Sequence, residues 1–153
     1  MPNTYTKIYI HIVFSIKGRE TLISNSWAIE LYKYITGIIT NKSQKLIAIN
    51  GMHDHIHILV GIKPDISISD LVRDIKSNST NFINNKKLVP GKFSWQEGFA
   101  AFSYSESQIP EVAGYIEKQK EHHQIKTFQE EYHDFLKKFN IKYDEKYLFE
   151  FYK

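Results

Sequence analysis

The sequence predicts an α+β domain in which a ferredoxin-like βαββαβ order forms an antiparallel sheet with helices on one face. Four short segments alternate β-branched or aromatic residues with other residues, the pattern of half-buried strands. Two amphipathic segments follow the first and third of these strands, as this fold requires. The length of 153 residues, 42% of them hydrophobic, suits a single domain with a substantial core over residues 1–153.

Each predicted element has a local signal in the sequence. Alternation in the first strand places Ile10, Ile12 and Phe14 on one face. Ser67 opens a segment that resembles a capping box at the start of the second helix. The expected strands are residues 5–16, 46–50, 55–62 and 99–103, and the expected helices are residues 25–40, 67–84, 109–119 and 128–139.

Two histidines interrupt the apolar run of the third strand. Because residues two apart on a strand share a face, His55 and His57 project together while Ile56 and Ile58 face the core. Two nitrogen ligands on a rigid strand can hold a metal ion, although two partly exposed histidines bonded across a sheet would give the same pattern. His53 shares their face but lies in the turn, where we expect a supporting or incidental role. Imidazole ligands alone do not select the metal.

A tyrosine and a glutamine stand four residues apart in the third predicted helix, the C-terminal helix added to the βαββαβ order. Tyr115 and Gln119 therefore share a helix face. The neutral amide oxygen of Gln119 could complete a two-histidine metal site, and a nearby cation would favour the deprotonated form of Tyr115. The alternative is a tyrosine at the rim of the core with its hydroxyl in water. His122 and His123 follow as possible proton carriers or as simply exposed residues.

The overall charge neither indicates nor excludes nucleic-acid binding, because the formal net charge is only +3. Basic residues on the second helix and the loop after it could form a strip that contacts DNA phosphates, or they could be a solvated helix face. These residues are Arg73, Lys76, Lys86, Lys87 and Lys92. Three aromatic residues could stack on unpaired bases, although core packing is the better interpretation for at least two of them: Trp95, Phe99 and Phe102.

The sequence contains no cysteine, so disulfides and thiolate metal sites are excluded. No apolar stretch approaches the roughly 20 residues of a membrane helix, and the N-terminus lacks the pattern of a secretion signal. We therefore expect a soluble cytoplasmic protein.

The order and spacing of these motifs resemble one family, the HUH single-strand transposases with one catalytic tyrosine, which are the transposase A proteins of small hairpin-ended bacterial insertion sequences. The resemblance covers nearly the whole chain, and His53 is a mild departure from the family's pattern. The segments that carry it are residues 11–14, 54–60, 67–69, 93–99 and 115–119, followed by His122 and His123.

The resemblance implies a metal-dependent DNA transposase. It implies that His55, His57 and Gln119 hold a divalent ion, Mg²⁺ or Mn²⁺, and that Tyr115 attacks a phosphodiester of single-stranded DNA at hairpin-containing element ends. A 5′-phosphotyrosine link and a free 3′-hydroxyl would result, and resealing would need no ATP. The resemblance also implies a homodimer in which the tyrosine helix of one subunit completes the histidine site of the other.

Two other functions are compatible with parts of the sequence. A histidine-triad nucleotide hydrolase or transferase would use His53, His55 and His57, but Asp54 breaks the apolar spacing of that signature, and Tyr115 would have no role. A non-catalytic, domesticated binder of hairpin DNA would need none of the histidine, tyrosine and glutamine residues, so their presence argues against it.

Overall fold

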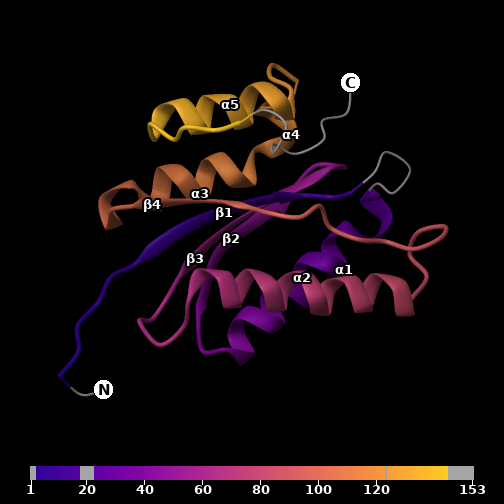
Figure 1. Ribbon diagram of the computed structural model, residues 1–153, viewed down its shortest axis with the longest axis horizontal. Helices are drawn as coiled ribbons and strands as arrows, with labels where there is room; N and C mark the ends of the chain where they lie inside the picture. Colours follow the sequence, from indigo (N-terminus) through magenta and orange to yellow (C-terminus); the bar gives the residue numbers. More distant parts are fainter. Residues whose placement is uncertain (1–2, 18–22, 123, 145–153) are drawn as a thin grey trace.

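The computed structural model describes residues 3–17, 23–122 and 124–144, which form a sheet covered by helices on both faces (Figure 1). Helices α1 and α2 lie against one face, and α3 and α5 lie against the other. The four strands are antiparallel in the order β2-β3-β1-β4, which confirms the predicted ferredoxin-like arrangement. The elements are β1 (Tyr9–Ser15), α1 (Asn25–Asn41), β2 (Lys45–Gly51), β3 (His55–Gly61), α2 (Ile68–Asn85), β4 (Ala100–Tyr104), the 3₁₀ turn η1 (Glu106–Gln108), α3 (Ile109–Glu117), α4 (Gln119–His122) and α5 (Phe128–Lys138).

The first strand is shorter than the sequence predicts. It begins at Tyr9 because both of its partner strands end there: β3 at Gly61 and β4 at Tyr104. At its other end Ser15 pairs with His55. β1 and β3 are therefore the two central strands, and both are buried along nearly their whole length.

The main core lies between the sheet and helices α1 and α2. Both helices begin at a serine whose side-chain oxygen accepts a backbone hydrogen bond: Ser24 from Ser26 N, and Ser67 from Asp70 N. The indole of Trp95 donates a 2.9 Å hydrogen bond to Ser79 of α2. The core includes Ile10, Ile12 and Phe14 of β1, Ile56, Ile58 and Val60 of β3, Trp27, Leu31 and Ile35 of α1, and Leu71 and Ile75 of α2.

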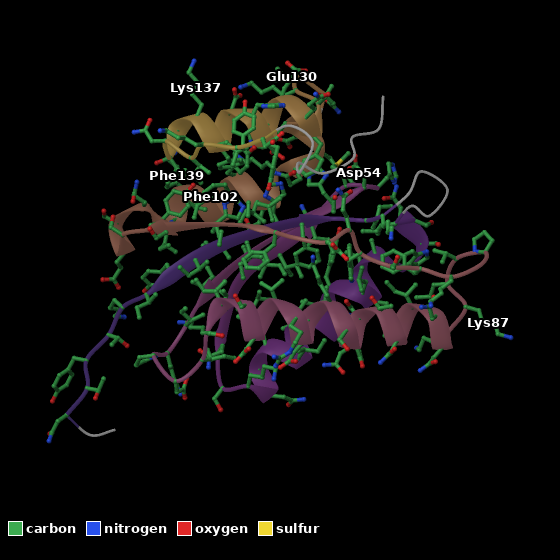
Figure 2. The ribbon with its side chains drawn as sticks, viewed as in Figure 1. Asp54, Lys87, Phe102, Glu130, Lys137 and Phe139 are labelled. Carbon is green, nitrogen blue, oxygen red and sulfur yellow. The ribbon has the colours of Figure 1, made fainter. Side chains whose placement is uncertain are left out.

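The opposite face of the sheet is covered by α3 and α5. Val112 and Ile116 of α3 pack against Leu59 of β3. The C-terminal end of α5 packs on β4 through Phe139, the residue directly after the helix, whose ring stacks on that of Phe102 with centroids 4.7 Å apart (Figure 2). The histidine face of β3 is thus enclosed by helices from the C-terminal third of the chain.

The predicted continuous helix over residues 109–119 is wrong at its end. Helix α3 stops at Glu117, Lys118 has φ −101° and ψ 28°, and the short helix α4 begins at Gln119. The carbonyl of Glu117 accepts a 3.0 Å hydrogen bond from the side chain of Asn50 in β2. This bond ties the last turn of α3 to the sheet, and the chain then changes direction before Gln119.

Among the described residues, no helix has the length and apolar character required to cross a membrane.

Candidate active site

His55 and His57 lie on the helix-covered face of β3 and are completely buried. Their ring centroids are 5.0 Å apart. The Nε2 atom of His57 donates a 2.9 Å hydrogen bond to Oε1 of Glu131, and Nε2 of His55 lies 3.5 Å from the same oxygen. The two imidazoles therefore converge as predicted, and they converge on a carboxylate.

Each imidazole is oriented through its other ring nitrogen. Nδ1 of His55 is bonded to the carboxylate of Asp54 at 2.7 Å, and Nδ1 of His57 is bonded to Nε2 of His11 at 2.8 Å. The ring of Phe128 also lies flat on that of His55, with centroids 3.8 Å apart. Such outer contacts fix the ring orientation of metal-binding histidines. His11 has no hydrogen-bond partner for its Nδ1 atom among the described residues.

Gln119 and Tyr115 reach the same point from α4 and α3. Oε1 of Gln119 lies 3.3 Å from Nε2 of His55, and its amide nitrogen donates a 3.2 Å hydrogen bond to Oε2 of Glu131. The hydroxyl of Tyr115 donates to that same oxygen. The structure thus brings together the four residues that the sequence singles out, although the two helical ones belong to separate helices.

Glu131 was missed by the sequence analysis. It lies on α5, only 4% of its surface is exposed, and its two oxygens contact both histidines, Gln119 and Tyr115. A signal was present, because Glu131 occupies the apolar stripe of α5 between Phe128 and Phe135. A carboxylate is rarely buried unless it is paired or binds a metal ion.

The donor atoms of His55, His57 and Glu131 lie within 4.8 Å of one another, so these three residues could hold a metal ion. Two imidazole nitrogens and one carboxylate oxygen are a common ligand set for divalent cations, and carboxylates suit Mg²⁺ and Mn²⁺ in particular. The amide oxygen of Gln119 adjoins this set. The residues therefore fit a divalent metal.

Burial shifts the pKa values of three side chains in the cluster. Burial opposes protonation of His55, but its bonds to Asp54 and Glu131 outweigh this and raise its pKa to about 9. Burial also raises the pKa of Tyr115 far above its usual value, and the Glu131 carboxylate adds to the effect. Burial and the neighbouring His57 lower the pKa of His11. Without a cation, the Tyr115 hydroxyl is therefore protonated at neutral pH.

The remaining predicted histidines differ in their placement. His53 is exposed, and its Nδ1 lies 3.0 Å from the carbonyl oxygen of Ile23, so His53 does not join His55 and His57. The ring of His122 stacks on Tyr115 with centroids 4.3 Å apart. His123 lies outside the described residues.

The predicted basic strip lies on α2 and the loop after it, on the other side of the sheet from the histidines. Lys87 points outward at the far end of α2 in Figure 2. Burial lowers the pKa of Lys76 to about 8. Arg73 pairs with Asp70 and Asp74, Lys76 donates to the carbonyls of Gln96 and Gly98, Lys86 pairs with Glu30, and Lys87 and Lys92 are exposed. DNA contact by this strip stays a prediction.

The three aromatic residues considered for base stacking belong mainly to the protein interior. Trp95 and Phe102 are buried in the main core, and Phe99 packs against it. Core packing is therefore confirmed for two of the three.

Comparison with known proteins identifies the family. The family model "Transposase IS200 like" matches residues 4–119. The ISDra2 transposase TnpA of Deinococcus radiodurans is 24% identical over 114 residues, which cover 71% of this chain and 81% of that protein.

Two solved structures have similar folds. One, a crystal structure of a protein assigned as a transposase from Deinococcus radiodurans, has a TM-score of 0.61 and 25% identity and covers 76% of this chain and 94% of its own. The other is a REP-associated tyrosine transposase bound to a REP hairpin. It has a TM-score of 0.57 and 16% identity, and the match covers 76% of this chain and 68% of that chain. Because the family model spans most of the chain and includes both histidines, Tyr115 and Gln119, this protein belongs to the IS200-like transposase family.

Proposed function

We propose that this protein cleaves and rejoins single-stranded DNA at hairpin-containing insertion-sequence ends, with Tyr115 as the nucleophile and a divalent metal as cofactor. One observation carries the proposal: the hydroxyl of Tyr115 lies within a buried cluster of His55, His57, Gln119 and Glu131 that fits a metal ion. A structural packing role would not require this set of polar groups in the interior.

His55, His57 and Glu131, with Gln119 beside them, would hold Mg²⁺ or Mn²⁺. When bound, the cation supplies Lewis-acid polarisation of a phosphate oxygen. The carboxylate of Glu131 favours these hard cations over the softer metals that imidazole ligands alone would accept. Asp54 and His11 keep the two imidazoles oriented.

The chemistry proposed for Tyr115 is an exchange of phosphodiesters. Its oxygen forms a bond to phosphorus while the bond from phosphorus to the 3′-oxygen breaks, and the proton lost by the Tyr115 hydroxyl passes by way of Glu131 to the departing oxygen, which leaves as a 3′-hydroxyl. Glu131 already accepts the hydrogen of the Tyr115 hydroxyl, so its Oε2 is placed to receive that proton. Attack of a 3′-hydroxyl on the phosphotyrosine link reverses the reaction and releases Tyr115.

Hairpin DNA is the proposed substrate because a protein of the same fold is bound to a REP hairpin. The exposed amines of Lys87 and Lys92 are available for phosphate contacts on the face away from the cluster.

Sharing of the site between two subunits is a separate proposal. Within this chain, Tyr115 contacts the Glu131 carboxylate that also binds His57 of the same chain. A shared site would require α3 to exchange between two copies. Mixing Tyr115→Phe protein with His57→Ala protein tests whether the site is shared. Formation of a covalent protein–DNA adduct returns in the mixture only if one copy supplies the tyrosine and the other supplies the histidine.

The central experiment is incubation of the protein with single-stranded element ends and Mg²⁺ or Mn²⁺, followed by denaturing electrophoresis. We expect a covalent protein–DNA adduct that chelator abolishes and that Tyr115→Phe lacks. Tyr34→Phe, at an exposed tyrosine of α1, is the matched control and should form the adduct normally. An adduct that persists in Tyr115→Phe would refute the proposal, and hairpin binding without any adduct would favour a non-catalytic binder.

A further inference from the structure

A cavity of about 340 Å³ lies next to the proposed nucleophile, between α3 and α5. It shares Tyr115 and Glu131 with the site described above. Most of the rest of its wall comes from residues that the proposed reaction does not use, including Tyr104 at the end of β4 and Phe135 of α5. Its volume lies at the lower end of the range for pockets that bind small organic groups.

We propose that this cavity receives one unpaired nucleobase of the DNA strand, the base of a nucleotide that flanks the phosphodiester attacked by Tyr115. The inference rests on the proposed function, because it assigns the position of the substrate at the same nucleophile. A strand whose phosphate reaches the Tyr115 hydroxyl must place a neighbouring base close to the Tyr115 side chain, and the cavity is lined by that side chain.

Two unpartnered nitrogens support a polar ligand. Nδ1 of His11 and Nε2 of His122 are buried and have no hydrogen-bond partner among the described residues, and both residues line the cavity. His11 itself is completely buried. A buried polar atom without a partner is unfavourable, so a site with two of them favours a ligand that supplies hydrogen bonds. The edge of a nucleobase carries both donors and acceptors.

The cavity walls also suit a flat aromatic ligand. The rings of Tyr104, Tyr115 and Phe135 border the cavity, and the ring of Phe135 meets that of Tyr115 edge-on with centroids 5.8 Å apart. His122 adds a ring stacked on Tyr115. Stacking on such rings is how proteins bind unpaired bases without reading a duplex.

Polar side chains complete the cavity. Glu111 lies at its side on α3, where its carboxylate oxygens can accept hydrogen bonds from exocyclic amines of a base. Lys138 of α5 lies above the ring of Tyr104, 5.6 Å from its centroid, where its ammonium group can meet a phosphate. Glu111 precedes Tyr115 by one helical turn, so a larger side chain at this position would narrow the cavity beside the nucleophile.

The first test changes the DNA and leaves the protein intact. An oligonucleotide that forms the Tyr115 adduct is remade with an abasic site at the nucleotide on either side of the cleaved phosphodiester. Adduct formation should fall roughly 5- to 150-fold for one of the two, the range expected for one lost stacked base. If no intact element-end oligonucleotide forms an adduct, the proposed function is refuted. Normal adduct formation with both abasic oligonucleotides would refute only the base-binding cavity.

The second test ties the effect to the cavity. Glu111→Trp should lower adduct formation with the intact oligonucleotide, and the abasic site should then cause no further loss. Glu117→Trp changes an exposed residue of the same helix outside the cavity and should behave like the unaltered protein in both respects. Equal abasic effects in the two variants would contradict the assignment.

A binding measurement provides a readout that does not depend on catalysis. Tyr115→Phe protein is mixed in chelator with the oligonucleotide carrying 2-aminopurine at the position sensitive to base removal. Stacking inside the cavity should quench its emission on binding, whereas emission that stays that of the free strand while anisotropy reports binding would overturn the proposal.

Discussion

The metal-free protein should lose stability as the pH rises from 6.5 to 8, because His55 holds a proton in the folded state that it releases on unfolding. Its folded pKa is raised to about 9 from the ordinary value of 6.5, so the stabilisation is complete below pH 6.5 and is lost as the pH approaches 9. One pKa unit corresponds to about 1.36 kcal/mol, so the free energy of unfolding should fall by about 2 kcal/mol over 1.5 pH units.

Two other groups with shifted pKa values affect stability outside this pH window. His11 has a lowered pKa, so its effect is confined below the ordinary pKa of histidine, where stability rises with pH. Lys76, with a pKa lowered to about 8, increases stability only as the pH rises above that value. Neither His11 nor Lys76 therefore adds to the fall in stability between pH 6.5 and 8.

Urea unfolding in the presence of EDTA, followed by tryptophan fluorescence, measures this slope. Asp54→Asn removes a carboxylate that raises the pKa of His55 and should reduce the loss of stability to less than half. Glu121→Gln, at an exposed position of α4, should keep the full slope. A free energy of unfolding that stays constant from pH 6.5 to 8, or an equal slope in Asp54→Asn, would refute the reasoning.

Three further predictions concern the same cluster and the sheet beneath it. The affinity for Mn²⁺, measured by titration calorimetry, should rise by up to about tenfold per pH unit between pH 6.5 and 9, because the cation must displace the proton of His55. An affinity that stays constant over this range would exclude His55 as a ligand. Glu131→Ala should lower the free energy of unfolding, measured in urea, by about 3 kcal/mol, because the buried donors around it lose their acceptor. The exposed Glu130→Gln should change this free energy by less than about 1 kcal/mol, and equal losses in the two variants would contradict the buried role of Glu131. Gly51→Ala should lower the free energy of unfolding by roughly 3 kcal/mol, because a Cβ atom there would overlap the His55 carbonyl. Gly37→Ala in α1 has open space around it and should raise the free energy of unfolding by about 1 kcal/mol. Thermal denaturation that ranks the two variants otherwise would show that Gly51 can accept a Cβ atom.

The strands and the histidine pair could be predicted because both depend on local alternation. A period of two places His55 and His57 on one face whatever the partner strands are, and the structure confirms this face. Tyr115 and Gln119 were also predicted to meet the histidines. Their placement on one helix was wrong, because the end of α3 depends on a hydrogen bond from Asn50, which is distant in the sequence.

Glu131 and His11 could not be placed from local pattern alone. The position of Glu131 depends on how α5 docks on the sheet, and α5 follows the segment that matches the family model. His11 contacts His57 only because β1 and β3 pair with Val13 opposite His57, and register is a long-range property. The contacts of both residues with the histidine pair became visible only in the tertiary structure.

The two indoles of this chain, Trp27 and Trp95, are both buried on the side of the sheet that carries α1 and α2. Their emission therefore monitors the integrity of that half of the molecule and should stay constant when a ligand enters on the other half. Indole emission can therefore serve as an internal control in ligand titrations. A titration that alters this emission indicates unfolding of the half that carries α1 and α2. A titration that leaves it unchanged while another probe responds indicates ligand binding alone.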